Sequence, residues 1–404
     1  MTDTARDVLI TGIGLVSSLG EGIAAHLDLL ERGSAPQPVI ESERFAPYFV
    51  HPLPPIDWST QIPKKGDQRQ METWQKLGTY AAGLALTDAG IPTDESVRSG
   101  VDMIVAAGGG ERDTAVDALV MERARQSGGS GAVMNETLAN ELRPTLFLAQ
   151  LSNLLAGNIS IVHKVTGSSR TFMGEEGAGI SAVSVAAARI AAGQSDICLV
   201  GAAFAAERKD LILNYEMGGL LLRSDWRSVF ARRAPADGLA IGSVGVFLVL
   251  ESAEHAAARS APAYAKLTRV AGDRGPRRGE ALAARLDDLI KGAPADDGLL
   301  VLSGASGIEA PTAVERQVLA NTLPQAPVRA YGSLLGHSFE AQFPAGIALA
   351  AATLARGTRL PAFDSGEESP ALQPARAALV TTVGHLQAEG VCLLEPVGPA
   401  GETR

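Results

Sequence analysis

Short apolar runs that end at glycine alternate with amphipathic, alanine-rich stretches along almost the whole chain. Such runs are typical of buried strands, and apolar positions three and four residues apart are typical of helices. We expect strands at residues 7–14, 103–107, 170–173, 197–202, 242–251, 264–272, 298–303, 377–382 and 390–395. We expect helices at residues 21–31, 70–90, 112–127, 135–143, 144–157, 177–192, 279–291, 312–321 and 345–356. Residues 36–63 are rich in proline and predict an irregular surface segment.

The alternation of strands and helices predicts an α/β fold. It favours parallel or mixed sheets that carry helices on both faces. The pattern runs twice, first with insertions over residues 1–251 and then in shorter form over residues 252–404. We therefore predict two α/β halves that arose by internal duplication.

The composition fits this fold and excludes several other classes of protein. A chain with 46% hydrophobic and 20% charged residues is neither disordered nor fibrous. Its 44 glycines and 4% aromatic residues suit tight turns and helices packed closely on sheets. The net charge of −10 argues against nucleic acid as the main partner, because phosphate contacts require a basic face.

Cysteine content and the N-terminal residues predict a cytoplasmic protein. Two cysteines, Cys198 and Cys392, are too few for a disulfide framework in a chain of 404 residues, so we expect a reducing compartment. Residues 1–7 are polar and lack the basic region and long apolar run of a secretory signal. The apolar stretches are interrupted before ~18 residues, so we expect no membrane span.

Five segments, taken in order, carry a resemblance to a known family. They are residues 8–20, 84–90, 192–202 and 245–251, and the pair Gly336–His337. Together they resemble the β-ketoacyl-acyl-carrier-protein synthases of the thiolase superfamily. The resemblance implies a thiolase-like five-layer αβαβα body with internally duplicated halves, usually a dimer. It also implies acyl-carrier-protein-dependent chain elongation by decarboxylative condensation, without a cofactor.

The resemblance places Glu176 where this family has its nucleophilic cysteine, as judged from the spacing to Gly193. In the family, that cysteine begins a buried helix and takes the acyl chain, while two histidines stabilise the anionic species. A helix N-terminus lowers the pKa of a thiol, and imidazole donors meet the developing negative charge. A carboxylate cannot replace the thiolate in thioester exchange, because an acyl-glutamate anhydride is high in energy.

The other positions of the family's site also differ in this chain. The resemblance places Ser303 at the first histidine, His337 at the second and Gly332 at a supporting lysine. The family's glycine-rich oxyanion loop corresponds to residues 384–387, where His385 stands. Cys198 and Cys392 lie in apolar strands away from the nucleophile position, and we interpret both as small buried hydrophobes.

His385 could share a cavity with Glu176 and His337. Two imidazoles and a carboxylate are suitable metal ligands. Their wide separation along the chain gives no ligand-spacing pattern, so we expect no metal.

Basic residues near the start of a long helix are candidates for docking the carrier protein. Lys64, Lys65 and Arg69 stand where family members gather basic residues for the acidic carrier, although Asp67 and Glu72 interleave with them. Because the chain as a whole is acidic, docking requires such a local basic patch or a basic partner subunit. The alternative is an ordinary solvated helix start.

These residues leave three functions open. The favoured one is a non-condensing subunit that pairs with a Cys-containing ketosynthase like a chain-length factor, with Glu176 accepting backbone N–H bonds at its helix start. The second is an active enzyme, either a malonyl-carrier-protein decarboxylase or an unorthodox 3-oxoacyl synthase. The third is a homodimer that binds an acyl chain or a carrier protein. Residues 66–74 and 171–176 also resemble ketosynthase-like proteins that serve the very-long-chain acyl groups of lipid A.

Overall fold

The computed structural model describes residues 5–30, 36–142, 150–223 and 225–398. Its central element is an eleven-stranded sheet in the order β11-β10-β12-β13-β9-β1-β8-β6-β4-β5, with β2 paired to β1. The strands of this sheet are β1 Val8–Ser17, β2 Gly20–Glu21, β4 Asp102–Ala107, β5 Ser169–Met173, β6 Ile197–Phe204, β8 Val244–Ser252, β9 Ala265–Asp273, β10 Leu299–Ser303, β11 Val328–Ala330, β12 Ala377–Val383 and β13 Glu389–Glu395. A separate small sheet pairs β3 (Val50–His51) with β7 (Ile241–Gly242).

The order and direction of the strands repeat within this sheet. In the first set, β4 is parallel to β5 and β6, whereas β6–β8 and β8–β1 are antiparallel. In the second set, β10 is parallel to β11 and β12, whereas β12–β13 and β13–β9 are antiparallel. Residues Val8 to Ile10 of β1 pair with β9 and join the two sets edge to edge. The predicted division between residues 251 and 252 falls at the end of β8, the last strand of the first set.

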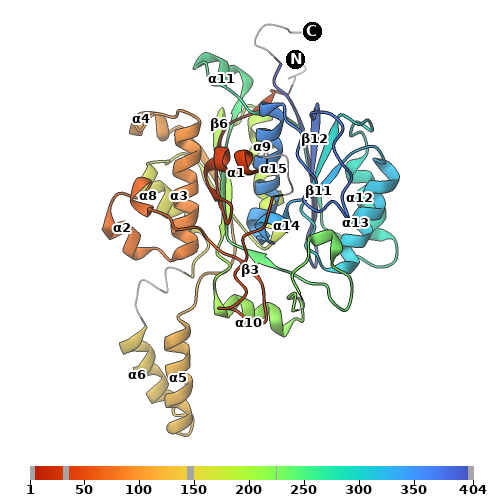
Figure 1. The fold of residues 1–404 in the computed structure, drawn as a ribbon. Coiled ribbons are helices and arrows are strands. Elements are labelled where there is room, and N and C mark those ends of the chain that lie inside the picture. Colours follow the sequence, from red (N-terminus) through yellow and green to blue (C-terminus); the bar gives the residue numbers. More distant parts are fainter. Residues whose placement is uncertain (1–4, 31–35, 143–149, 224, 399–404) are drawn as a thin grey trace.

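Helices lie on both outer faces of the sheet sets and between them (Figure 1). On one side α3 packs on β1, β6 and β8, with α8 against α3. In the middle α9 and α15 pack on each other and on both sets, and α12 and α13 cover the far side. The helices are α1 Gly22–Leu30, α2 Lys65–Gln70, α3 Thr73–Asp88, α4 Glu95–Arg98, α5 Thr114–Gln126, α6 Gly131–Glu141, α8 Leu154–His163, α9 Glu176–Ala191, α10 Lys209–Met217, α11 Ala253–Ala258, α12 Ala281–Ile290, α13 Glu309–Thr322, α14 Gly332–Leu335 and α15 Gln342–Arg356. The predicted α/β, thiolase-like five-layer fold is confirmed.

The middle layer is built from small residues, so its elements approach closely. Every residue of α15 from Gln342 to Leu354 is buried. A Cβ at Gly179 of α9 would lie 2.3 Å from the main-chain oxygen of Glu340, which belongs to the short 3-10 helix η3 (Phe339–Ala341). Only glycine allows this contact. It holds the start of α9 beside the segment that follows α14.

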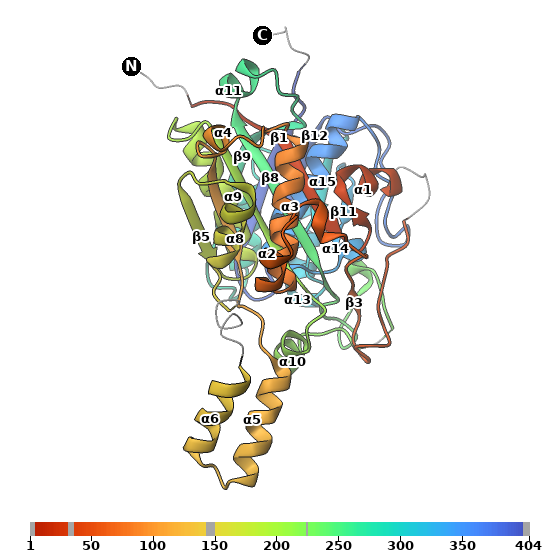
Figure 2. The same cartoon turned by 90° about the vertical axis from the view of Figure 1, so that its left-hand side faces the viewer.

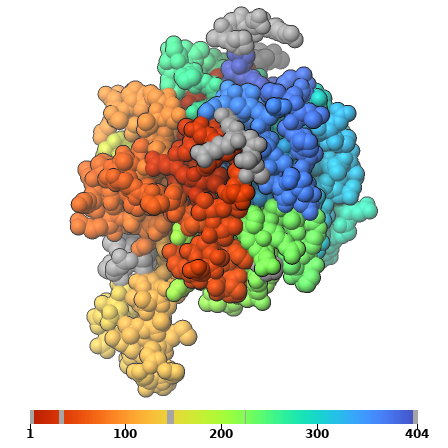
Figure 3. Space-filling view, viewed as in Figure 1, coloured from red at the N-terminus to blue at the C-terminus, as the bar shows by residue number. Residues whose placement is uncertain are grey.

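A helical hairpin stands away from the body. α5 and α6 pack against each other, and both project beyond the rest of the molecule (Figures 2 and 3). Met121 on α5 is 74% exposed. The hairpin corresponds to the two helices predicted at residues 112–127 and 135–143, of which residue 143 lies outside the described residues.

Two predicted helices are wrong in their bounds. The helix expected at residues 70–90 is observed as α3, which begins at Thr73 because the backbone N–H of Glu72 donates to the Gln75 side chain (3.1 Å) in a capping box. Gln70 is instead the last residue of the separate helix α2. Of the helix expected at 144–157, residues 144–149 lie outside the described residues, and only residues 154–157 are helical, as the start of α8. Gly157 stands inside α8 rather than at its end, since the buried Leu155, Ile159 and His163 hold that helix in the core.

The two cysteines are unpaired and buried in strands, as predicted. Burial raises the pKa of the Cys198 and Cys392 thiols above the ordinary value. Both are therefore inert thiols inside the core. Among the described residues, no helix is both long and apolar enough to span a bilayer.

Candidate functional site

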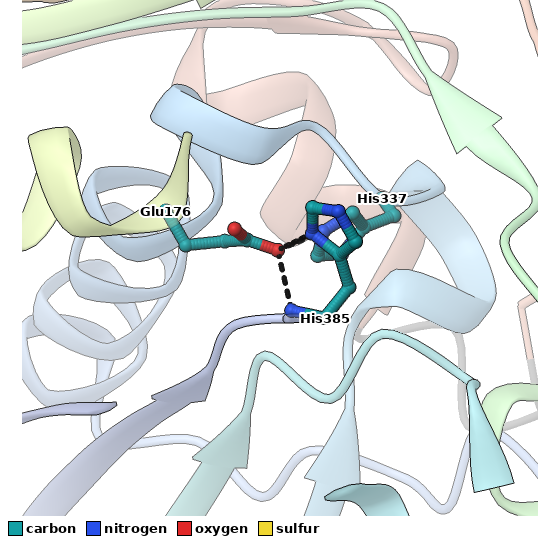
Figure 4. A group of neighbouring side chains, drawn as sticks. All are labelled: Glu176, His337 and His385. Carbon is teal, nitrogen blue, oxygen red and sulfur yellow. Dashed lines mark hydrogen bonds and ion pairs between the residues drawn. The ribbon is translucent and has the colours of Figure 1, made fainter. Parts of the chain in front are cut away.

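Three side chains from distant parts of the chain meet at the start of α9 (Figure 4). Glu176 is the first residue of α9, His337 follows α14, and His385 lies in the loop between β12 and β13. Nε2 of His337 lies 2.7 Å from Oε1 of Glu176, and Nδ1 of His385 lies 2.9 Å from the same oxygen. The main-chain N–H of His385 also donates to that oxygen, at 2.9 Å. One buried carboxylate oxygen thus has three nitrogen partners.

The charges of this cluster follow from its hydrogen bonds. Burial raises the pKa of Glu176, but the hydrogen bonds from His337 and His385 and the charges of these two residues outweigh it, so the pKa is well below its ordinary value. Burial lowers the pKa of His385, but the hydrogen bond and charge of Glu176, and then the charge of Glu175, outweigh burial. The pKa of His385 is therefore raised above its ordinary value. Because an ionised carboxylate only accepts hydrogen bonds, both ring nitrogens that face it carry protons. Glu176 and His385 therefore form a buried ion pair.

Glu175, the residue before Glu176, extends the hydrogen-bond and ion-pair network. Its Oε2 lies 3.7 Å from Nε2 of His385, and its Oε1 accepts a hydrogen bond from the Tyr215 hydroxyl at 3.1 Å. The Phe339 ring stacks on Tyr215 and meets both histidine rings edge-on, with centroids 4.7 Å from His337 and 5.3 Å from His385. The Phe339 ring therefore packs against both imidazole rings and restrains their orientation.

Backbone contacts hold His337 in place. Its N–H donates to Ala240, and its carbonyl accepts from the N–H of Gly242. Gly336, just before it, has a φ of +75°, and a Cβ there would lie 2.7 Å from the Cα of Gly242. Only glycine makes this turn without strain. Gly336 thus allows the backbone turn that directs the His337 imidazole toward Glu176.

Ser303 and Gly332 do not join the cluster through their own contacts. The Ser303 hydroxyl, at the end of β10, donates to the buried Glu315 carboxylate of α13 at 2.9 Å. Burial raises the pKa of Glu315 to about 6, although hydrogen bonds from Thr381 and Ser303 oppose this. Gly332 begins α14, and a Cβ there would already contact Val229 at 3.3 Å. The Gly332 position therefore lies in a short helix, where a side chain would press on Val229.

Glu340 is a residue near the site that the sequence did not single out. It is 4% exposed. Burial first, and then the charges of Glu176 and Glu175, raise its pKa to about 8. The signal available in the sequence was an acidic residue three positions after His337, between Phe339 and Ala341.

A pocket of about 670 Å³ opens beside the cluster. It lies along α9 between the end of β5 and the end of β9, and Glu175 and Glu176 form part of its wall. Apolar side chains such as Ile180 and Val185 line it together with Ser181 and Ser184. The pocket is large enough for a small-molecule ligand and offers it both apolar and polar side chains.

The three predicted docking residues lie apart from the cluster, on the surface. Lys65 and Arg69 belong to α2, and Lys64 is its N-cap residue. All three are exposed. Asp67 in the first turn of α2 lies between them in sequence.

Comparison with known proteins identifies the family. The model described as "Beta-ketoacyl synthase, N-terminal domain" matches residues 5–256. The chain is 26% identical over 271 residues to the 3-oxoacyl-[acyl-carrier-protein] synthase 2 of Vibrio harveyi, covering 65% of this chain and 61% of that protein. The chain belongs to the β-ketoacyl synthase family. The match spans about three fifths of the length of that relative.

Solved structures agree on the fold over nearly the whole chain. The ishigamide ketosynthase/chain length factor matches with a TM-score of 0.77 and 21% identity, over 98% of this chain and 100% of the other. A ketosynthase solved in complex with its type II polyketide acyl-carrier protein matches with a TM-score of 0.72 and 16% identity, over 97% and 100%. The ketosynthase fold thus extends over the residues beyond 256 as well.

Proposed function

We propose that this chain is a non-condensing subunit of an acyl-carrier-protein-dependent fatty-acid or polyketide synthase. In this proposal it pairs with a Cys-containing ketosynthase and shapes the acyl pocket of the pair, and the division between residues 251 and 252 separates its two halves. The proposed setting is the cytoplasm, where free cysteines such as Cys198 and Cys392 persist. The narrower link to very-long-chain acyl groups of lipid A is part of the same proposal.

The observation that carries the proposal is the state of Glu176. It stands at the nucleophile position and is held as an anion by His337 and His385. The N–H that reaches it from the backbone is that of His385, in the loop that corresponds to the family's oxyanion hole, rather than one from α9 as expected. The Glu176 carboxylate therefore already accepts the hydrogen bond of the His385 main-chain N–H. A condensing enzyme needs a donor of this kind to stabilise the oxyanion formed from its thioester.

The surroundings of Ser303, the pocket and the edge strand β5 support the same conclusion. Without an imidazole at Ser303, a main stabiliser of the enolate is missing, and the Ser303 hydroxyl is already bonded to Glu315. The pocket beside α9 supports a role in acyl binding. β5 is one of the two edge strands of the sheet, and its Met173, which lines the pocket, is 72% exposed, which suits a contact with a partner subunit.

The test is to assay the chain alone and with a Cys-containing ketosynthase. Alone, with malonyl- and acyl-carrier protein, we expect no release of carbon dioxide and no ketoacyl product. Co-expression should give a 1:1 complex, and Val185→Trp in the pocket wall should shorten its product. Leu213→Trp, on the exposed face of α10, is the control and should leave product length unchanged.

Two outcomes would redirect the proposal. Release of carbon dioxide that disappears in Glu176→Ala would identify a decarboxylase. A homodimer that never exchanges with a ketosynthase, yet binds acyl-carrier protein, would identify a binding protein instead.

Carrier docking at α2 is expected to depend on charge. Lys65→Glu should weaken binding of acyl-carrier protein about two- to fivefold at low salt, since one exposed ion pair contributes roughly 0.5–1 kcal/mol. Lys291→Glu, at the end of α12 on the other side of the body, makes the same change of charge and should have little effect (Figure 1). Titration by calorimetry at two salt concentrations measures both. Equal losses in the two variants would place the carrier elsewhere.

A further inference from the structure

We propose that Glu176, His337 and His385 form a binding site for one divalent transition-metal ion, Zn²⁺ in particular. Each of these residues offers one ligand atom, an imidazole nitrogen or a carboxylate oxygen, and the three atoms all lie within 4.8 Å of one another; all three residues are buried. The expectation of no metal rested on their separation in the sequence. The fold removes that separation, because α9, the segment after α14 and the β12–β13 loop converge at this point.

The distances suit a small ion after a slight expansion. Ligands of a tetrahedral Zn²⁺ stand roughly 3.3 Å apart when each bond is about 2.0–2.1 Å. The observed contacts of Oε1 of Glu176 are 2.7 Å to His337 and 2.9 Å to His385. The ion takes the place of the protons on Nε2 of His337 and Nδ1 of His385, which are released to solvent, and widening each contact by about half an ångström makes room for it. The carboxylate can ligate while keeping the N–H bond of His385, because it offers two oxygens and several lone pairs.

A carboxylate lies near the other ring nitrogen of one of the ligands. Metal-binding histidines usually direct their other ring nitrogen at a carboxylate, which fixes the ring. Nε2 of His385 lies 3.7 Å from Oε2 of Glu175, an ion-pair distance rather than a hydrogen bond, and the Tyr215 hydroxyl donates to Glu175. The Phe339 ring supports both imidazoles. A loosely packed surface cluster would have none of these supports.

Charge and chemistry favour a divalent transition metal. Two imidazoles and one carboxylate are the donors that Zn²⁺ and its neighbours prefer, whereas Mg²⁺ and Ca²⁺ prefer oxygen alone. The cation would replace the proton of His385 as the counter-charge of the buried Glu176 carboxylate. Three protein ligands also leave one position open for water or a small ligand beside the pocket that Glu176 lines.

The experiment titrates Zn²⁺ into the metal-stripped full chain by calorimetry and repeats the titration with Co²⁺ by absorption spectroscopy. We expect one tight site, with Co²⁺ bands of a four-coordinate nitrogen and oxygen site and no thiolate charge-transfer band. Glu176→Gln and His385→Gln should each weaken binding at least about 100-fold, beyond what outer contacts usually contribute. His255→Gln, a partly exposed histidine paired with Glu251, is the matched control and should bind like the unaltered chain.

Several results would overturn the proposal. They are absence of stoichiometric Zn²⁺ binding by the folded chain, equal binding by the cluster variants, or a thiolate band in the Co²⁺ spectrum. Circular dichroism shows whether each variant is folded, and the Co²⁺ spectrum of the unaltered chain tests the ligands without any substitution. The titration needs no acyl substrate, so metal binding and the proposed non-condensing role can fail separately.

Discussion

Replacing Glu176 with alanine is expected to lower the free energy of unfolding by about 3–5 kcal/mol, because removal of one partner from a buried ion pair leaves the other uncompensated. In Glu176→Ala, the ring and main-chain N–H groups of His385 both lose their acceptor, and so does His337. Urea unfolding at pH 7 in buffer with a chelator measures the loss.

A neighbouring carboxylate supplies the control for this prediction. Glu175→Ala removes a side chain that is 36% exposed, lies 3.7 Å from His385 and accepts a hydrogen bond from Tyr215. Its effect should be about 1–1.5 kcal/mol, as for one hydrogen bond and a partly exposed pair. A loss in Glu176→Ala that is no larger than that of the control would contradict the buried ion pair described above.

Replacing Glu340 with glutamine is expected to stabilise the protein at alkaline pH and to change little at pH 5. The pKa of Glu340 is about 8 when folded and 4.5 in its ordinary state. Between these values the folded chain binds the proton and the unfolded chain releases it, so wild-type stability falls as pH rises. At about 1.4 kcal/mol per pKa unit, the full difference reaches roughly 3–5 kcal/mol above pH 8. Glutamine mimics the neutral acid and carries no such cost.

Unfolding of Glu340→Gln and the unaltered chain should therefore be compared at pH 5, 7 and 9. The difference in free energy of unfolding between the two proteins should increase from pH 5 to 7 and again from pH 7 to 9. Glu315→Gln is a useful comparison, because burial raises its pKa to about 6 and its gap should open mainly below neutral pH. A gap for Glu340→Gln that stays constant with pH would show that Glu340 is already ionised at pH 5.

Most strands and helices could be predicted from local pattern. The strand at 197–202 and the helix at 177–192 match β6 and α9 closely, since a buried strand and an alanine-rich helix each carry a strong periodic signal. The pattern did not predict α10 or the three-residue strand β11. It also ended one helix at Gly157, although packing on α3 keeps that glycine inside α8. Local signals fail where tertiary contacts decide the outcome.

The sequence by itself determined the fold class and carried the prediction that no thiol stands at the nucleophile position. Both follow from residue types at fixed places along the chain, such as Glu176 before Gly193. Only the tertiary structure decided what Glu176 touches, because His337 and His385 are 161 and 209 residues away from it in sequence. Periodicity reports which face of an element is buried but not which distant loop packs there. For that reason the ion pair, the raised pKa of Glu340 and the proposed metal site could be recognised only from the tertiary structure.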